Sequence, residues 1–147
     1  MEELVNQMKK VLADSFSLYL KAHYYHWNVT GPHFSEYHNF FGGLYEEVFG
    51  SVDSTAEEIR ALGAFAPGSL KRFMDLSTIM GEEQVNLDPL VMIQTLYDDN
   101  NTVIESLKEA NRLAEETGSI GVANYVQDRI DKHMKHKWML SAHMKRT

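Results

Sequence analysis

Four side chains in the first half of the chain are of the types that bind divalent metal ions: His26, His38, Asp53 and Glu57. The chain has no cysteine, which excludes disulfides, thiolate nucleophiles and Cys-ligated zinc or iron–sulfur sites. Any metal must therefore be held by His, Asp or Glu. The formal net charge of -7 favours a cation over a nucleic acid as the partner of such a site.

Asp53 and Glu57 are one helical turn apart, as two carboxylates must be to hold one cation. On a helical wheel that starts at His38, they fall at about 60° and about 100°, on one face. The apolar residues of the same stretch fall on a different arc, at about 240° to 340°. These residues are Phe41, Leu44, Tyr45, Val48, Val52 and Ile59. The two carboxylates are therefore expected to point away from the core of their own subunit.

The two histidines can meet each other but not the carboxylates of the same helix. His38 precedes Asp53 by 15 residues, which separates them by about 22 Å along a helix axis. His26 ends one expected helix and His38 begins the next, across a turn at Gly31-Pro32. If all four ligands serve one site, the histidines come from one subunit and the carboxylates from another, and the sequence predicts an obligate homo-oligomer.

Other interpretations of these residues stay open at this point. An acidic pair at this spacing is more often a solvated helix face than a metal site. The remaining histidines are expected to be surface groups or neighbours of the site: His23, His33, His133, His136 and His143. Trp27, Trp138 and the tyrosines are expected to pack in the core or at interfaces. No acidic residue stands three positions before any histidine, so the Glu-x-x-His pattern of a metal site inside a helical bundle is missing.

The elements that must position these residues are predicted to be helices. Apolar residues at helical spacing and sparse Gly and Pro predict one helix ending before Thr30, then helices over about 35–62, 89–116 and 119–144. Asp88-Pro89 is a typical helix start. Most of the glycines fall in groups that punctuate the long helical stretches, and Gly42-Gly43 is one such group. The 25 or so residues between the second and third helices should cross over, with a short helix at 70–75.

The pattern predicts an all-α fold, a ferritin-like four-helix bundle with a long crossover and a short extra helix between the second and third helices. One domain is expected over residues 1–147. No apolar run reaches the roughly 20 residues that span a bilayer, so no membrane role is expected. No leader sequence is recognised at the start of the chain, and a cytoplasmic location is the default expectation.

Several motifs of the chain resemble those of the Dps (DNA-protection-during-starvation) family of miniferritins. The sequence His26-Trp27-Asn28-Val29-Thr30-Gly31 is followed at the family's spacing by His38, Asp53 and Glu57. Ala66-Pro67-Gly68 and Trp138-Met139-Leu140 are also similar to the family's pattern.

The resemblance implies a ferroxidase that works as a hollow dodecamer. His26 and His38 of one subunit and Asp53 and Glu57 of another would form the iron site, since imidazole and carboxylate suit iron. Fe(II) would be oxidised, preferably by hydrogen peroxide and otherwise by oxygen, and Fe(III) stored in the cavity, which protects against oxidative damage. Trp27 could trap a radical or simply pack.

Two departures from the family pattern concern iron entry and DNA. The positions that line the family's iron pores correspond to Glu115, Ile120 and Asn124, of which one is acidic, with Asp128 one turn further on. A basic cluster near the C-terminus could contact DNA: Lys132, Lys135, Lys137, Lys145 and Arg146. The alternative function is a DNA-binding, nucleoid-compacting protein with little iron oxidation, which would be associated with the nucleoid. A third hypothesis is a purely structural helical oligomer.

Overall fold

The computed structural model describes residues 1–145, and these form four long helices and one short one. The helices are α1 (Glu2–Asn28), α2 (Phe34–Ala61), α3 (Leu70–Leu76), α4 (Pro89–Glu116) and α5 (Ile120–His143). The predicted all-α bundle with a crossover and a short extra helix is confirmed, with boundaries within a residue or two of those expected. No helix of the described residues is long and apolar enough to cross a membrane.

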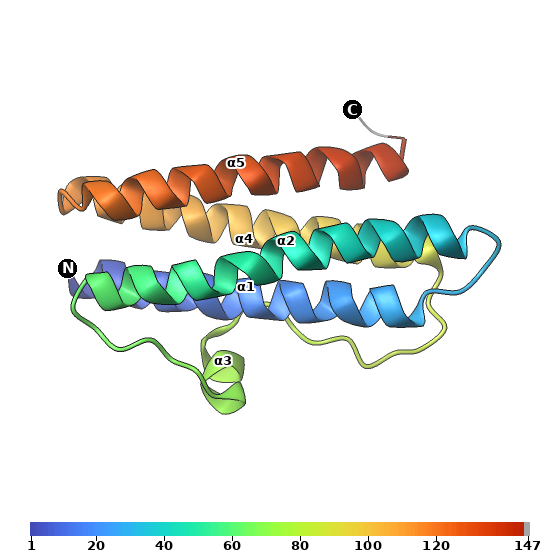
Figure 1. Cartoon of the computed structure of the whole chain (residues 1–147), viewed down its shortest axis with the longest axis horizontal. Coiled ribbons are helices and arrows are strands. Elements are labelled where there is room, and N and C mark those ends of the chain that lie inside the picture. The colour runs from blue at the N-terminus through green and yellow to red at the C-terminus, as the bar shows by residue number, and fades with distance from the viewer. Residues whose placement is uncertain (146–147) are drawn as a thin grey trace.

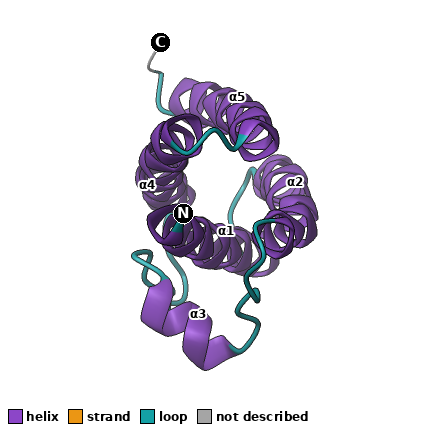
Figure 2. Ribbon diagram, turned by 90° about the vertical axis from the view of Figure 1, so that its left-hand side faces the viewer, coloured by secondary structure: helices purple, strands orange, loops and turns teal. Residues whose placement is uncertain are grey.

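The four long helices form a bundle of two hairpins, α1–α2 and α4–α5, with α1 packed against α4. Figure 1 shows that α2 and α4 run in the same direction, because the chain crosses the length of the bundle between them. Seen end-on, α3 lies outside the ring of four helices, next to α1 (Figure 2). The apolar stripes of all four long helices meet in one buried core.

Local sequence explains where the helices begin and end. The Asp88 carboxylate accepts a hydrogen bond of 2.8 Å from the Leu90 amide, and Pro89 opens α4, as the sequence predicts. Ser69 caps α3 in the same manner. Gly42 and Gly43 do not interrupt the second helix: both lie inside α2, within the helix predicted over about 35–62.

The crossover is held to α1 by hydrogen bonds at two points. The fully buried Asp14 carboxylate accepts from the Thr78 amide at 2.6 Å and from the Ser77 hydroxyl at 3.0 Å. Further along, the Tyr25 hydroxyl donates to Glu82 and the Tyr24 hydroxyl to the Gln84 carbonyl, each at 2.6 Å. The bonds at the first point satisfy the buried Asp14 carboxylate, and the two points together fix the path of the crossover along α1.

Candidate metal centre

The rings of His26 and His38 stack on each other at the α1–α2 turn. Their centroids are 3.7 Å apart and their planes are inclined by 20°. The Nδ1 atom of each ring lies 2.7 Å from the backbone carbonyl oxygen of the other residue. A carbonyl oxygen only accepts, so both Nδ1 atoms carry hydrogen and donate.

This reciprocal pair of hydrogen bonds decides which ring atoms remain available. With Nδ1 protonated, a neutral imidazole keeps its lone pair on Nε2, which is the atom a metal would bind. Hydrogen bonds from the distal ring nitrogen to a carbonyl are also the usual support of a metal-ligating histidine, because they fix the ring's orientation. The two rings therefore form a preorganised pair of nitrogen ligands for a metal ion.

The turn between the helices has few residues and a required glycine. Helix α1 ends where the Val29 amide donates to the Tyr25 carbonyl at 2.9 Å. Gly31 has φ +124°, a backbone conformation that side chains disfavour. The Phe34 amide then donates back to the Gly31 carbonyl at 3.1 Å as α2 starts. This turn brings residue 26 and residue 38 side by side.

Gly42 lies against the His26 ring, a closeness that the sequence reasoning did not recognise. A Cβ atom at Gly42 would lie 3.2 Å from both Cε1 and Nδ1 of His26. The missing side chain gives the His26 ring its place against α2. The signal available in the sequence was a glycine one turn after His38, in the middle of a long helical stretch.

Asp53 and Glu57 lie on α2, exposed to solvent and away from the histidine pair. Helix α2 is unbroken from Phe34 to Ala61, so the distance of about 22 Å between His38 and Asp53 along its axis holds. Nowhere in residues 1–145 do three or more His, Asp or Glu side chains gather as a metal cluster. One subunit thus presents two nitrogen donors at one place and two carboxylates at another.

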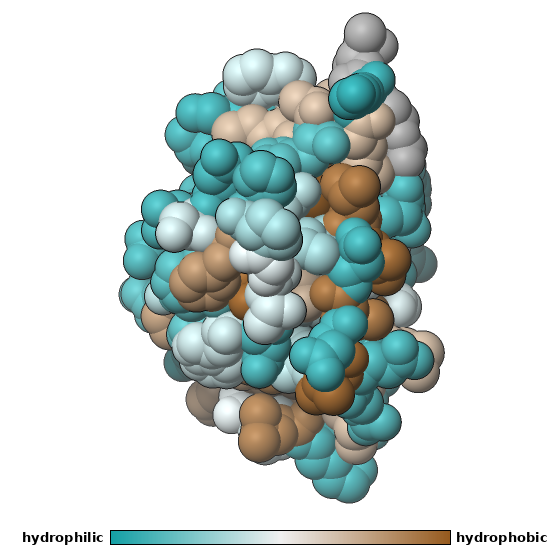
Figure 3. All heavy atoms as spheres, turned by 90° about the vertical axis from the view of Figure 1, so that its right-hand side faces the viewer, coloured by the Kyte–Doolittle hydropathy of each residue, from teal (hydrophilic) through white to brown (hydrophobic). Residues whose placement is uncertain are grey.

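Aromatic side chains surround the histidine pair on the outside. The His23 ring stacks on the Tyr45 ring, with centroids 3.8 Å apart. The Trp27 ring also contacts the His23 ring, with centroids 3.9 Å apart. Trp27 is 57% exposed, so it does not pack in the core of this subunit. Burial and the neighbouring His26 lower the pKa of His23. Figure 3 views the end of the bundle that carries the α1–α2 turn, where hydrophobic areas interrupt a largely hydrophilic surface.

A second pair of histidines, His133 and His136 on α5, lies inside the bundle. The expectation that these two are surface groups is wrong, since they are 0% and 5% exposed. Buried residues follow one another along this helix at spacings of three or four, and both histidines belong to the series: Val122, Val126, Arg129, His133, His136 and Leu140. That spacing is the signal that could have placed them in the interior.

The ring nitrogens of the inner pair are mostly occupied by protein partners. His133 donates from Nδ1 to the Asn100 side chain at 2.8 Å and accepts at Nε2 from Arg129 at 3.1 Å. His136 contacts Glu47 through Nε2 at 2.7 Å. Arg129 and Glu47 also form a two-pronged ion pair at 2.6 and 3.0 Å.

Charge and burial set the protonation of this inner cluster. Burial, with the Arg129 charge, holds the pKa of His133 well below its usual value, so His133 is neutral. Although burial alone would raise it, hydrogen bonds from His136 and Arg129 hold the pKa of Glu47 far below its usual value. The Glu47 carboxylate is thus committed to protein donors. Of the described side chains, the Nδ1 atom of His136 is buried without a hydrogen-bond partner.

The pore candidates lie around the α4–α5 turn, at the end of the bundle opposite the α1–α2 turn (Figure 1). Glu115 and Asn124 line a shallow groove of about 380 Å³, with Ile120 on its wall. Ile120 is 82% exposed, and Asp128 is exposed one turn beyond Asn124. The groove therefore has one acidic side chain, Glu115, in its lining.

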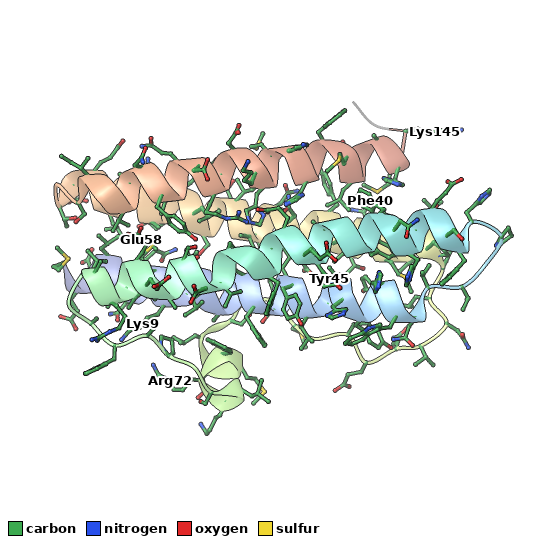
Figure 4. All side chains as sticks on the ribbon, viewed as in Figure 1. Lys9, Phe40, Tyr45, Glu58, Arg72 and Lys145 are labelled. Atoms are coloured by element: carbon green, nitrogen blue, oxygen red, sulfur yellow. The ribbon has the colours of Figure 1, made fainter. Side chains whose placement is uncertain are left out.

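The basic cluster on α5 is spread over the helix surface and the residues after it. Lys132, Lys135 and Lys145 are exposed, and Lys137 is half-buried. Lys145 stands at the end of the described chain in Figure 4. Arg146, which the sequence analysis adds to this cluster, lies outside the described residues.

The family of the chain follows from comparison with known proteins. Residues 5–147 match the model of the ferritin-like domain family, Ferritin. The chain is 31% identical to general stress protein 20U of Bacillus subtilis, covering 97% of this chain and 98% of that one. It is 28% identical to the DNA protection during starvation protein of Helicobacter pylori, over 93% of this chain and 95% of the relative.

A solved structure agrees with these sequence relatives. The Dps protein of Vibrio cholerae, described as a member of a broad superfamily of ferritin-like diiron-carboxylate proteins, superposes with a TM-score of 0.93 at 28% identity. The match covers 97% of this chain and 89% of the Vibrio chain. Together with the bundle, its crossover and its extra helix, these likenesses show that the chain belongs to the Dps family within the ferritin-like superfamily.

Proposed function

We propose that this protein binds Fe(II) between subunits, oxidises it with hydrogen peroxide or oxygen, and stores the ferric product inside a hollow homo-oligomer, a dodecamer. His26 and His38 supply nitrogen donors, and Asp53 and Glu57 of a neighbouring subunit supply oxygen donors. Iron is the substrate of this reaction. Removing Fe(II) and peroxide together limits the formation of hydroxyl radicals.

The observation that carries the proposal is the reciprocal hydrogen bonding of His26 and His38, each Nδ1 donating to the other residue's carbonyl at 2.7 Å. This hydrogen bonding leaves the Nε2 lone pairs of the two stacked rings available to bind a metal ion. Two imidazoles alone make an incomplete ligand shell, and carboxylate oxygens are suitable additions for iron. An incomplete shell also leaves positions for the oxidant.

The placement of the carboxylates supports the intersubunit arrangement. Asp53 and Glu57 are exposed on α2, on the same chain but about 22 Å from His38 along the helix axis. In a symmetric dimer, a two-fold axis can bring the carboxylates of each chain to the histidines of the other. Trp27 and Phe34, which flank the histidine pair, are 57% and 41% exposed and would be covered by such a neighbour.

DNA binding is the alternative function, and the structure offers less for it. The exposed lysines of α5 share the surface with Asp128 and Asp131, and the whole chain carries a net charge of -7. A protein that holds DNA through its phosphates needs a dense basic surface. We therefore favour iron oxidation.

The proposal is tested by adding Fe(II) anaerobically, then peroxide, and following ferric absorbance. The wild type should oxidise iron well above the rate in buffer, and the His38→Ala, Asp53→Ala double variant should fall to the buffer rate. A matched control is the His143→Ala, Asp131→Ala double variant. It changes exposed residues of the same two types, both on α5. Equal rates for the wild type and the His38, Asp53 variant would refute the proposal.

A further inference from the structure

A row of aromatic side chains leads away from the histidine pair along the groove between α1 and α2. Tyr19, His23 and Trp27 follow one another at four-residue spacing on α1, and Tyr45 faces them from α2. Figure 4 labels Tyr45 at the boundary between the two helices. This row borders the buried core, because Tyr19 and Tyr45 are half-buried and pack against it, whereas His23 is half-buried and Trp27 is exposed.

The rings are close enough to form a continuous path to His26. The edge of Tyr45 meets His26 with centroids 5.2 Å apart, and the Tyr45 ring lies parallel to His23, at 3.8 Å and 6°. Tyr19 is 6.1 Å from Tyr45. Aromatic rings at helical spacing are usually packing, so the stacking alone assigns no role.

One polar contact gives this row a chemical property that packing does not need. The Tyr19 hydroxyl lies 3.1 Å from Nδ1 of His23. A tyrosine loses an electron easily only if its phenolic proton can leave at the same time. A histidine nitrogen within hydrogen-bond distance can take that proton and return it.

We propose that Tyr19 is a one-electron donor to the iron-oxidation site, passing its electron through Tyr45 to His26 and its proton to His23. This inference rests on the proposed function, since it needs Fe(II) and hydrogen peroxide as the reactants at the histidine pair. It adds a residue that touches neither iron nor the oxidant.

The electron is needed because peroxide takes up two electrons and one Fe(II) supplies one. In the first step one peroxide, one Fe(II), the Tyr19 phenol, neutral His23 and two protons from solvent give two waters, one Fe(III), the neutral Tyr19 radical and protonated His23. The O–O bond breaks, iron and tyrosine are oxidised, and peroxide is reduced.

In the second step another Fe(II) supplies an electron and protonated His23 returns the proton, which restores the Tyr19 phenol and neutral His23 and leaves a second Fe(III). The sum is two Fe(II) oxidised for each peroxide, without release of a hydroxyl radical. A site that holds a single Fe(II) can thus reduce peroxide completely.

The experiment is rapid-freeze electron paramagnetic resonance of the assembled protein after mixing one Fe(II) per subunit with an equal amount of peroxide. The wild type should give an organic-radical signal whose hyperfine lines narrow when the protein carries ring-deuterated tyrosine. Tyr19→Phe keeps the ring and loses the hydroxyl, and His23→Phe keeps an aromatic ring and loses the proton acceptor. Both should abolish the signal, whereas Tyr24→Phe, the matched control, should retain it, because Tyr24 lies on α1 outside this row and its hydroxyl donates to the Gln84 carbonyl.

A spin trap gives the second readout. At one Fe(II) per subunit Tyr19→Phe should release severalfold more hydroxyl radical than the wild type, and with Fe(II) in excess the two should be equal. The inference is overturned if the wild type oxidises iron without a tyrosine radical, if the signal survives in Tyr19→Phe, or if it is insensitive to tyrosine deuteration. If the wild type does not oxidise Fe(II) at all, the proposed function fails first and this inference with it.

Discussion

The protein has two pairs of histidines, and they differ in which ring nitrogens the protein itself uses. In the outer pair, His26 and His38 bind each other's carbonyl oxygens through Nδ1 and keep Nε2 free. In the inner pair, His133 uses both nitrogens on Asn100 and Arg129, and His136 directs Nε2 to Glu47. Histidine content alone would not distinguish the two pairs; their hydrogen bonds do.

Under the proposed function, the outer pair serves the chemistry and the inner pair serves stability. The outer pair is half-buried beside exposed Trp27, and its Nδ1 atoms are committed to backbone carbonyls while its Nε2 atoms remain available. The inner pair belongs to a buried network that joins α2, α4 and α5 through Glu47, Asn100 and Arg129. Changes at the inner pair should affect folding, and changes at the outer pair should affect iron oxidation.

The largest expected effect comes from breaking the inner network at Arg129. Arg129→Met removes the partner of a partly buried carboxylate, and the free energy of unfolding should fall by about 3 kcal/mol. Urea denaturation measures it. The Glu47→Leu, Arg129→Met double variant removes both charges and should recover only part of the loss, because the Nε2 atoms of His133 and His136 then lose their partners. The rate of iron oxidation per folded protein should stay at the wild-type level in both variants. If Arg129→Met lowers the free energy of unfolding by less than about 1 kcal/mol, the network does not have the stabilising role described above.

The second effect is the dependence of stability on pH. The pKa of His133 is lowered in the folded state from 6.5, so the unfolded chain binds more protons below pH 6.5. Stability is then fully present above that pH and falls as pH decreases, by up to about 1.4 kcal/mol per pH unit for this group. Glu47, whose pKa is lowered from 4.5, adds to the loss below pH 4.5.

His133→Gln isolates this contribution, because a glutamine keeps hydrogen-bonding atoms and does not titrate. The variant's unfolding free energy should change less between pH 6.5 and pH 4.5 than the wild type's does. The lowered pKa of His23 acts in the same direction in both proteins and cancels in the comparison. Identical slopes for the two proteins would show that His133 is not the group responsible.

A smaller effect is expected at the outer pair from Gly42→Ala. The new methyl group would meet the His26 ring at 3.2 Å and displace it, which should weaken iron binding or slow oxidation by about 10-fold. Gly43→Ala is the matched control, since nothing lies within 4 Å of a Cβ there. That variant should gain up to about 1 kcal/mol of stability and keep its rate. Equal rates for the two alanine variants would remove Gly42 from the account of the site.

The sequence allowed much of the fold to be predicted, because its signals are local. Asp88-Pro89 predicts the start of α4, and the Gly31-Pro32 turn predicts the approach of residues 26 and 38. The inner network could not be predicted in this way. Arg129, His133 and His136 are polar, and only their partners on α2 and α4, 33 to 89 residues away, make their burial possible.

The candidate site was predicted in its residues and only partly in its supports. Spacing and the family resemblance named His26, His38, Asp53 and Glu57. The stacking of the two imidazoles, the close approach of Gly42 and the Tyr19–His23 hydrogen bond each depend on how α1 packs against α2. A sequence pattern does not specify those distances. The sharing of the site between subunits stays a prediction.

The most direct test of that prediction is complementation between two inactive chains. One chain carries His26→Ala and His38→Ala, the other carries Asp53→Ala and Glu57→Ala, and each forms an oligomer without an intact site. When the two are unfolded and reassembled in equal amounts, random pairing around two-fold axes restores one intact site in each mixed dimer. The mixture should then oxidise Fe(II) at about a quarter of the wild-type rate. If the mixture, containing confirmed mixed oligomers, is no faster than either variant alone, the site is not shared between subunits.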